Sequence, residues 1–427
     1  MPLGFYTIMA AQFFSALADN ALLIAAIAAL RDMNAPPEYE PLLKTFFAFF
    51  YVAMAAFVGA FADSMPKGRV MFISNTIKIA GCAMMFFSIH PLLAYAVVGF
   101  GAAAYSPAKY GILTEYLPHR LLIAANGWIE GLTVAAIVLG VVLGGFLIRP
   151  EIAQTVARLD LPLIGKRLGE SNETALLIIA LLYLIAALFN LYVPRTNVDH
   201  KPLKKNPLYL MHEFGHCLGL LWRDRLGQIS LGVTTLFWGA GATLQFIIIQ
   251  WADEALGLGL SQSSMLQGVV AIGVAAGAIV AAKYVKLKDS LKVIPLGIMM
   301  GFVVCALLLP HVLWSAIGLL LFVGILSGLF VVPMNALLQH RGHILMGAGH
   351  SIAVQNFNEN LSILIMTVLY YGMIKIHVPI NFVIVLFGAL VAGIMYLLKL
   401  RHEAHQRRHD DLRYLDTQDN FHSSSHS

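Results

Sequence analysis

Residues 312–338 have the sequence VLWSAIGLLLFVGILSGLFVVPMNALL, which contains no Lys, Arg, Asp or Glu. A helix needs about 20 consecutive apolar residues to cross the hydrocarbon core of a bilayer, so this stretch is long enough to span a membrane. The rest of the chain has the same character, because 59% of its 427 residues are hydrophobic and only 12% are charged. A soluble domain carries about 25% charged residues. The composition excludes a disordered chain or a disulfide-rich scaffold, and it predicts a polytopic membrane protein.

Apolar runs of similar length recur along the whole chain and are separated by Pro, Gly or clusters of charge. The alternating ten-residue segments of a transmembrane β-barrel are absent from the sequence. The sequence therefore predicts an all-α polytopic membrane protein with twelve transmembrane helices. The expected spans are 5–30, 42–62, 69–89, 92–116, 124–148, 174–193, 226–251, 264–282, 293–310, 312–338, 348–374 and 379–399.

A polar stretch at 194–225 is the one long interior loop of the cytoplasmic side, and it divides the twelve spans six and six. We expect an N-terminal six-helix half at 1–193, a cytoplasmic linker with an interfacial helix at 194–225, and a C-terminal six-helix half at 226–400. The last segment, 401–427, is expected to be a disordered cytoplasmic tail that carries several His residues.

The two halves share polar and Pro positions at an offset of 226 residues. Pro107 in the fourth span matches Pro333 in the tenth, and each lies among small residues. The same offset carries Asp19 in the first span onto Gln245 in the seventh. Transporters are often built from such internal repeats, with their binding sites near the middle of the bilayer. The offset therefore favours a duplicated transporter with a central pathway.

The distribution of Lys and Arg predicts the orientation. Of the 28 Lys and Arg residues, most fall on one side of the predicted spans, together with both termini. The positive-inside rule places that side in the cytoplasm. On this assignment Lys44 and Lys375 belong to the outer side. The sequence pI of about 9.0 then reflects membrane topology, and no nucleic-acid partner is expected.

Five ionisable residues fall within predicted spans: Asp19, Lys78, Lys109, Glu130 and Glu359. An ionisable group inside a membrane is costly unless it faces a cavity or a partner. The side chains of Lys78 and Lys109 could instead reach the cytoplasmic interface, but an Asp side chain is too short to do so. We therefore expect Asp19 to be functional. The dense polar run QNFNEN at 355–360 either joins helices or lines the pathway.

The linker contains a complete HExxH motif, HEFGH at 212–216, which places two His on one face of a helix as in zinc proteases. A short linker has no room for a catalytic domain, and no further ligand set lies near. An amphipathic helix on the membrane surface at about 207–221 is the better interpretation. We expect no metal site, no cofactor and no enzymatic activity.

Several stretches resemble known transport proteins. The segment GAFADSMPKGR at 59–69 resembles the loop between the second and third spans of the major facilitator superfamily. In that loop an Asp at a helix end and nearby basic residues latch a gate. Further stretches resemble the bacterial lysophospholipid transporter family over nearly the whole chain. They are QFFSALADN (12–20), GAAAYSPAKYGIL (101–113), ANGWIE (125–130), LFWGAG (236–241), FVVPMNALLQ (330–339) and AVQNFNEN (353–360).

This resemblance implies the major facilitator fold and a flippase-like activity in the bacterial inner membrane. The substrates would be lysophosphatidylethanolamine and lysophosphatidylglycerol, moved from the outer to the inner leaflet. A separate acyltransferase/acyl carrier protein synthetase would then reacylate them. An alternative on the same fold is a proton-coupled exporter of small amphiphilic compounds. Such exporters usually have a Gly-Pro signature in the fifth span, where this chain has GVVLGG at 140–145.

We expect Lys109 to attract the substrate phosphate, and Asp19 either to pair with Lys109 or to accept an ethanolamine ammonium. Neutral hydrogen bonds to the head group would come from the four side chains of Asn20, Gln245, Asn335 and Gln355, and Glu359 would complete the substrate site. The gate would be latched by Asp63 and Arg69, with Lys67 and Glu130 as further gating residues.

Overall fold

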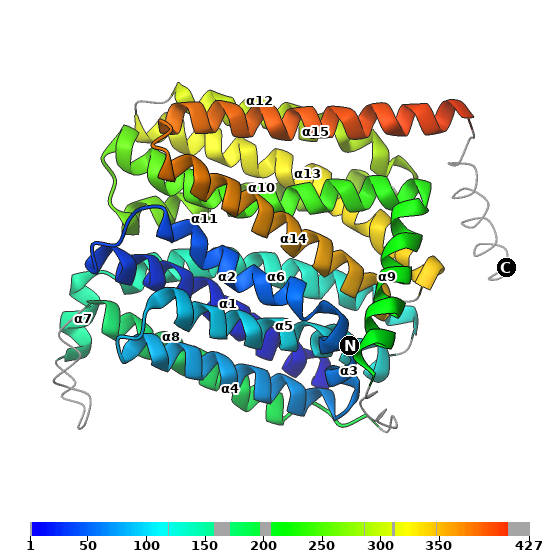
Figure 1. Ribbon diagram of the computed structural model, residues 1–427, viewed down its shortest axis with the longest axis horizontal. Helices are drawn as coiled ribbons and strands as arrows, with labels where there is room; N and C mark the ends of the chain where they lie inside the picture. Colours follow the sequence, from blue (N-terminus) through cyan, green and yellow to red (C-terminus); the bar gives the residue numbers. More distant parts are fainter. Residues whose placement is uncertain are drawn as a thin grey trace.

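The computed structural model describes residues 2–117, 119–157, 171–196, 206–285, 287–309, 312–346 and 348–408. These residues form helices and connections, with no strand among them (Figure 1). The α-helices are α1 Leu3–Asp32, α2 Tyr39–Ala53, α3 Ala55–Asp63, α4 Lys67–Phe86, α5 Pro91–Tyr116, α6 His119–Leu147, α7 Pro150–Ala157, α8 Ser171–Leu191, α9 Pro207–Arg223, α10 Arg225–Leu256, α11 Leu260–Tyr284, α12 Ile294–Cys305, α13 Leu313–Met346, α14 Ala348–Lys375 and α15 Ile380–Arg408.

Each of the twelve predicted spans coincides with helical structure, so the all-helical fold class is confirmed. Eight helical segments of the described residues are individually long and apolar enough to cross a membrane. The span predicted at 42–62 is divided into α2 and α3 at Met54, where φ is −100° and ψ is 0°. Hydrogen bonds from Met54 N to Phe50 O and from Val58 N to Met54 O continue across this point. The division is therefore a bend in one span.

Other boundaries differ from the sequence prediction because helices continue beyond the apolar window. Helix α13 runs to Met346, past the predicted end at 338, and α15 runs to Arg408, into the segment predicted to be a disordered tail. The span predicted at 293–310 begins and ends in 3₁₀ turns, Leu287–Val293 and Ala306–Leu308, around the short helix α12. The sequence does not predict the short helix α7, because eight residues are too few to give an apolar periodic signal.

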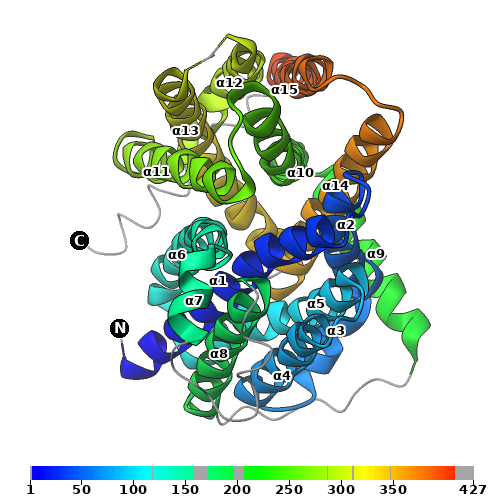
Figure 2. The ribbon, with the colours of Figure 1, turned by 90° about the vertical axis from the view of Figure 1, so that its left-hand side faces the viewer.

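The helices form two groups, best seen along their axes (Figure 2). Helices α1–α8 make up the N-terminal group and α10–α15 the C-terminal group, while α2 meets α14 and α6 meets α11 where the groups touch. We call the end of the molecule that contains Leu3 and Arg408 the termini end (Figure 1). The other end, which contains the connection between α1 and α2, is called the opposite end.

Close packing within the C-terminal group depends on glycine. Helices α11 and α13 cross where Gly273 and Gly277 face Gly324 and Gly328, four residues apart on each helix. A Cβ atom on Gly277 would collide with the carbonyl oxygen of Ile325. Small residues at this spacing let two backbones approach closely, and dispersion then holds the helices together in lipid, where no hydrophobic force between them is available.

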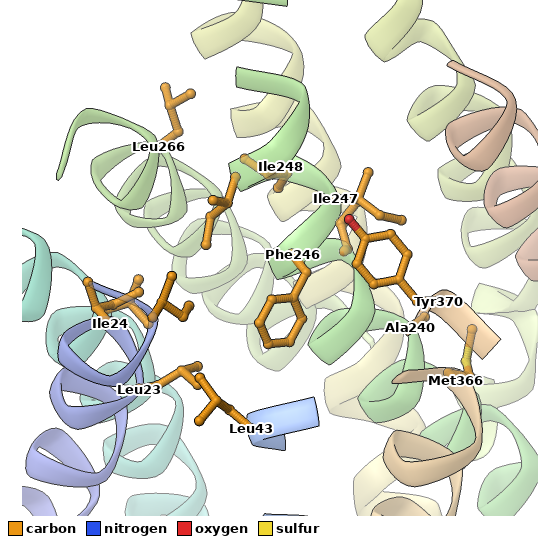
Figure 3. Packing of buried hydrophobic residues seen from close by; sticks show 14 of the residues in the cluster. Leu23, Ile24, Leu43, Ala240, Phe246, Ile247, Ile248, Leu266, Met366 and Tyr370 are labelled. Carbon is orange, nitrogen blue, oxygen red and sulfur yellow. The ribbon is translucent and has the colours of Figure 1, made fainter. Parts of the chain in front are cut away.

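Contacts between the groups are mostly apolar near the opposite end. Leu23 of α1, Leu43 of α2 and Phe246 of α10 belong to one buried cluster that crosses from one group to the other (Figure 3). We call the part of this cluster formed by Leu23, Leu43 and Phe246 the opposite-end seal. Polar contacts between the groups include a hydrogen bond between the Thr45 and Thr367 hydroxyls at 2.8 Å, one from Arg149 Nε to Ser261 Oγ at 3.1 Å, and a partly exposed ion pair between Arg31 and Asp253 at 4.0 Å. An interface of this composition can separate without leaving buried charges unpaired.

Candidate functional site

A cavity of about 190 Å³ lies between the two groups in the middle of the bundle. Its walls come from α1, α2, α4, α5 and α6 of the N-terminal group and from α10 and α14 of the C-terminal group. The ionisable side chains on its walls are Asp19, Lys44, Lys78, Lys109, Tyr51, Tyr95, Tyr105, Tyr110 and Glu359. Helices α4 and α14 are long enough to span a membrane but are not among the eight apolar segments, and both contribute polar side chains to these walls. Their polar residues therefore serve the cavity.

The cavity is anchored by an ion pair between Asp19 of α1 and Lys78 of α4. Lys78 Nζ lies 2.7 Å from Asp19 Oδ2 and also donates to Ser15 Oγ at 3.0 Å. The second carboxylate oxygen, Asp19 Oδ1, accepts a hydrogen bond from the Tyr183 hydroxyl of α8 at 2.7 Å. Lys78 is 2% exposed at its side chain and Asp19 13%. The pair ties three helices together and leaves the carboxylate at the cavity wall.

Aromatic rings surround the Lys78 ammonium. The ring centroids of Tyr105 and Tyr183 lie 5.1 and 5.8 Å from Lys78 Nζ, within the range of cation–π attraction. Tyr95 adds a hydrogen bond from its hydroxyl to the backbone oxygen of Asp19 at 3.2 Å. The Lys78 ammonium is thus neutralised by Asp19 and enclosed by tyrosine rings. Its role is to hold the Asp19 carboxylate in place.

The expected pairing of Asp19 with Lys109 is wrong, because Lys78 occupies that position. Lys78 lies on α4, whereas Lys109 lies on α5. The sequence alone could not distinguish Lys78 from a lysine whose side chain reaches the membrane interface. Lys109 lines the cavity from α5, with its Nζ 4.4 Å from the ring centroid of Tyr110. It faces the same space as Asp19 without contacting it.

The C-terminal group contributes a polar patch from α14. Gln355 Nε2 donates to Glu359 Oε1 at 2.8 Å and to Asn335 Oδ1 of α13 at 2.7 Å. Gln355 and Glu359 line the cavity. Asn335 does not line it, and contacts Gln355 through the hydrogen bond that orients the Gln355 amide. Asn356 Nδ2 donates to Ser106 Oγ of α5 at 3.0 Å, which links the two groups beside the cavity.

The remaining two predicted substrate residues are separated by the structure. Asn20 lines the cavity and donates to Ala16 O at 2.9 Å, while its Oδ1 is buried with no hydrogen-bond partner among the described residues. Gln245 of α10 lies outside the cavity walls, 8% exposed, and its backbone oxygen accepts from Gln267 Nε2 at 3.1 Å. Contact between Gln245 and a substrate stays a prediction.

The predicted gating residues lie near the termini end. Lys67 begins α4 and pairs with Glu115 of α5 at 3.3 Å, and it also donates to Ala62 O at 2.8 Å. Arg69 is exposed and forms no ion pair with the residues whose side chains the structure describes, and its latch with Asp63 stays a prediction. The side chains of Asp63 and Glu130 lie outside the described part of the structure, although their backbones belong to α3 and α6.

The HExxH motif lies on α9, a helix two residues longer than predicted. Asn206 caps it by accepting from Leu208 N at 3.1 Å. Its buried side chains, Cys217 and Leu221, pack against α10, α13 and α14, while His212 and His216 are exposed. Within the described residues no cluster of three His, Cys, Asp or Glu could hold a metal ion.

Sequence reasoning missed Lys44 and Glu115 as site residues. The sequence assigns Lys44 to the outer side because it lies near the start of an apolar run, yet it belongs to α2 and lines the cavity. Glu115 gives no signal because it lies near the end of its span, and its partner Lys67 is distant in sequence. One signal in the sequence could have identified Lys44. It lies five residues after the start of α2, which is more than one helical turn, so its backbone is already inside the spanning segment.

Comparison with known proteins gives consistent results. Residues 8–367 match the model of the Major Facilitator Superfamily. The chain is 41% identical over 378 residues to the lysophospholipid transporter LplT of Yersinia enterocolitica serotype O:8 / biotype 1B, covering 88% of this chain and 89% of that protein. It is also 41% identical over 370 residues to LplT of Serratia proteamaculans strain 568, covering 86% and 88%.

Solved structures of other transporters share the fold. A bacterial homolog of the human lysosomal transporter Spinster, in an inward-facing and unoccupied conformation, superposes with a TM-score of 0.66 at 15% identity, covering 95% of this chain and 98% of that one. A mutant of the nucleoside transporter NupG gives a TM-score of 0.65 at 12% identity, covering 94% and 98%. At these identities the likeness concerns the fold alone.

Proposed function

This chain belongs to the lysophospholipid transporter family of the major facilitator superfamily, and from that premise we propose that its central cavity carries the head group of a lysophospholipid across the membrane. The chain is a multi-pass membrane transporter of lysophospholipids. The main support for this role is that charged side chains from both helix groups line the cavity, within an otherwise apolar bundle.

The chemistry of the substrate fits such a cavity. A lysophospholipid combines a charged head group with one acyl chain, and only the head group needs protection from lipid. A volume of about 190 Å³ is below the roughly 300–1,000 Å³ of sites that enclose a whole drug-sized ligand. In this proposal the head group occupies the cavity and the acyl chain lies between helices, against lipid.

We assign complementary roles to the two sides of the cavity. Lys109 attracts the phosphate, as an ammonium group does in other phosphate sites. Asp19 and Glu359 form the acidic side that accepts an ethanolamine ammonium, while Asn20 and Gln355 offer neutral hydrogen bonds to the glycerol hydroxyl. Asn335 positions Gln355 through the 2.7 Å hydrogen bond between them.

Movement of the head group requires the two helix groups to separate first at one end and then at the other. At the opposite end the apolar seal with Leu23 and Phe246 would open and close. At the termini end the gating residues are Asp63, Lys67, Arg69 and Glu130. The Lys67–Glu115 pair joins α4 to α5 within the N-terminal group and would fix the position of this gating segment. This proposal adds Glu115 to the gating residues expected from the sequence.

The cellular setting is proposed from the resemblance and from the Lys and Arg distribution. Both termini face the cytoplasm of a bacterium, in its inner membrane, and the transport direction is from the outer to the inner leaflet. Lysophosphatidylethanolamine and lysophosphatidylglycerol are the substrates, and a separate acyltransferase/acyl carrier protein synthetase reacylates them afterwards. The chain itself performs no chemical step in this proposal.

Reconstituted vesicles test the function. Fluorescently labelled lysophosphatidylethanolamine is placed in the outer leaflet, and its protein-dependent movement to the inner leaflet is followed with and without a proton gradient. Movement without a gradient supports a facilitator. No movement of this lipid, together with gradient-driven movement of a small amphiphilic cation, would support the proton-coupled exporter instead.

Variants at Lys109 test the site. Lys109→Gln removes the charge and is expected to raise KM about tenfold, since hydrogen bonds to charged groups contribute roughly 1.5–3 kcal/mol. Lys375→Gln is the matched control, because Lys375 lies on α14 outside the cavity. Equal KM values for both variants would refute the phosphate role of Lys109.

A further inference from the structure

Lys44 is a cavity-lining cation that forms no ion pair with any carboxylate in the part of the chain that the structure describes. It lies on α2 with its Nζ 5.8 Å from the ring centroid of Phe47, one turn farther along the helix. Among the described residues no carboxylate lies within 4.0 Å of this ammonium group, and no hydrogen bond reaches it. Asp19, the cavity-wall acid whose charge acts on Lys44 through space, is already engaged by Lys78 and by Tyr183.

An unpaired ammonium at this depth needs an explanation. Lys44 is the sixth residue of α2, so its backbone lies about 7.5 Å from the helix start, and its side chain lines the cavity. A charged side chain in a membrane-spanning segment is costly unless an anion or water reaches it. Its neighbour Leu43 packs into the opposite-end seal (Figure 3), so Lys44 lies where the seal meets the cavity.

Lys44 and Lys109 lie at opposite ends of the cavity. Helices α2 and α5 begin at the same level, because the rings of Tyr39 and His90 lie 6.3 Å apart. Lys109 is 18 residues beyond Pro91, so it lies about 27 Å along α5, and about 20 Å of helix axis separates it from the level of Lys44. The two lysines therefore enter the cavity at different levels along the bundle.

We propose that Lys44 is a second phosphate-binding residue, which receives the phosphodiester of the lysophospholipid at the opposite end of the cavity before Lys109 binds it. This inference rests on the proposed function and extends it. The ligand chemistry is a phosphate monoanion, and the Phe47 ring beside the ammonium keeps the site apolar enough for the charge interaction to be strong. The opening of the seal exposes Lys44 first.

The test measures transport of lysophosphatidylglycerol by Lys44→Gln and Lys44→Arg. We expect Lys44→Gln to raise KM about tenfold, the loss of one hydrogen bond to a charged group, and Lys44→Arg to stay within about threefold of the parent. Lys375→Gln is the matched control, because Lys375 also lies near the opposite end with an aromatic ring, Tyr371, 5.7 Å from its Nζ, but outside the cavity.

Two soluble or neutral probes identify the source of the phosphate. Glycerophosphoglycerol has the head group without an acyl chain and should inhibit lysophosphatidylglycerol transport by the parent. About tenfold more of it should be needed to inhibit Lys44→Gln to the same extent. Competition by uncharged monoacylglycerol should be unchanged. An effect that appears only in vesicles with anionic bulk lipid would mean that Lys44 binds membrane lipid, and it would overturn the proposal.

The outcomes separate the two proposals. If the parent protein moves lysophosphatidylglycerol and Lys44→Gln has an unchanged KM, or Lys375→Gln gives the same rise, Lys44 is not a phosphate site and the proposed function stands. If the parent moves no lysophospholipid, the proposed function fails. Glycerophosphoglycerol binding to the purified parent and to Lys44→Gln, measured by calorimetry, then still decides whether Lys44 binds phosphate.

Discussion

The ion pair between Asp19 and Lys78 gives the sharpest prediction about how this bundle is held together. Its two members lie 2.7 Å apart, and the Lys78 side chain is 2% exposed. Asp19→Asn keeps the shape of the side chain and leaves Lys78 charged without a counter-ion. Lys78→Met removes the opposite charge and places an apolar, flexible chain between the rings of Tyr105 and Tyr183.

The magnitude follows from the burial of the pair. Removal of one member of a buried ion pair is destabilising by roughly 3–5 kcal/mol, because the remaining charge is buried and uncompensated. Each single variant should therefore lose about 3 kcal/mol, which is more than a hundredfold in the unfolding equilibrium. The double variant, with no charge left, should lie within about 1 kcal/mol of the parent.

The assay is equilibrium unfolding by SDS in mixed micelles, with all four proteins measured under one set of conditions. The double-mutant cycle gives the coupling energy between the two positions, which we expect to be several kcal/mol. Losses that add within about 0.5 kcal/mol would refute the reasoning, because they would mean that the two side chains contribute independently.

Two further predictions concern helix packing and the termini-end latch. Gly277→Val should destabilise the protein by about 1–3 kcal/mol in the same unfolding assay, because its side chain would force α11 away from α13, and Gly393→Val, where a Cβ meets nothing within 4 Å, should be neutral. An effect of Gly393→Val as large as that of Gly277→Val would contradict this account of the packing. Lys67→Met should change the transport rate several-fold with KM nearly constant, because Glu115 then lacks its cation, and Arg69→Met should change the rate in the same way if Arg69 latches the gate with Asp63. An unchanged rate in both variants would contradict a gating role for this segment.

The fold could be predicted from the sequence because membrane insertion leaves a strong signal. Uncharged runs such as 312–338 locate a helix regardless of what it packs against, since every backbone polar group in lipid must be bonded within its own segment. The bend at Met54 and the extension of α15 to Arg408 could not be predicted in the same way. Both depend on packing or on residues outside the membrane, where hydropathy carries no information.

The site could be predicted only in part, because charge inside a span is visible in sequence but its partner is not. Asp19, Lys109 and Glu359 are identifiable from the sequence, and all three line the cavity. The partner of Asp19 is not, since Lys78 and Lys109 have the same chemistry and only the arrangement of α4 and α5 distinguishes them. Lys44 escapes the same reasoning because its position near a span end suggests exposure.

The central claim, that the lysophospholipid head group passes through the cavity between the helix groups, is tested most directly by photo-crosslinking. Lysophosphatidylethanolamine with a photoreactive group on its head is incubated with the protein in vesicles, illuminated, and the adducts are located by mass spectrometry. We expect adducts in 102–110 of α5 and 352–363 of α14, which line the cavity from both sides. Adducts confined to the exposed apolar residues of 181–192, on the outer surface of α8, would contradict the account.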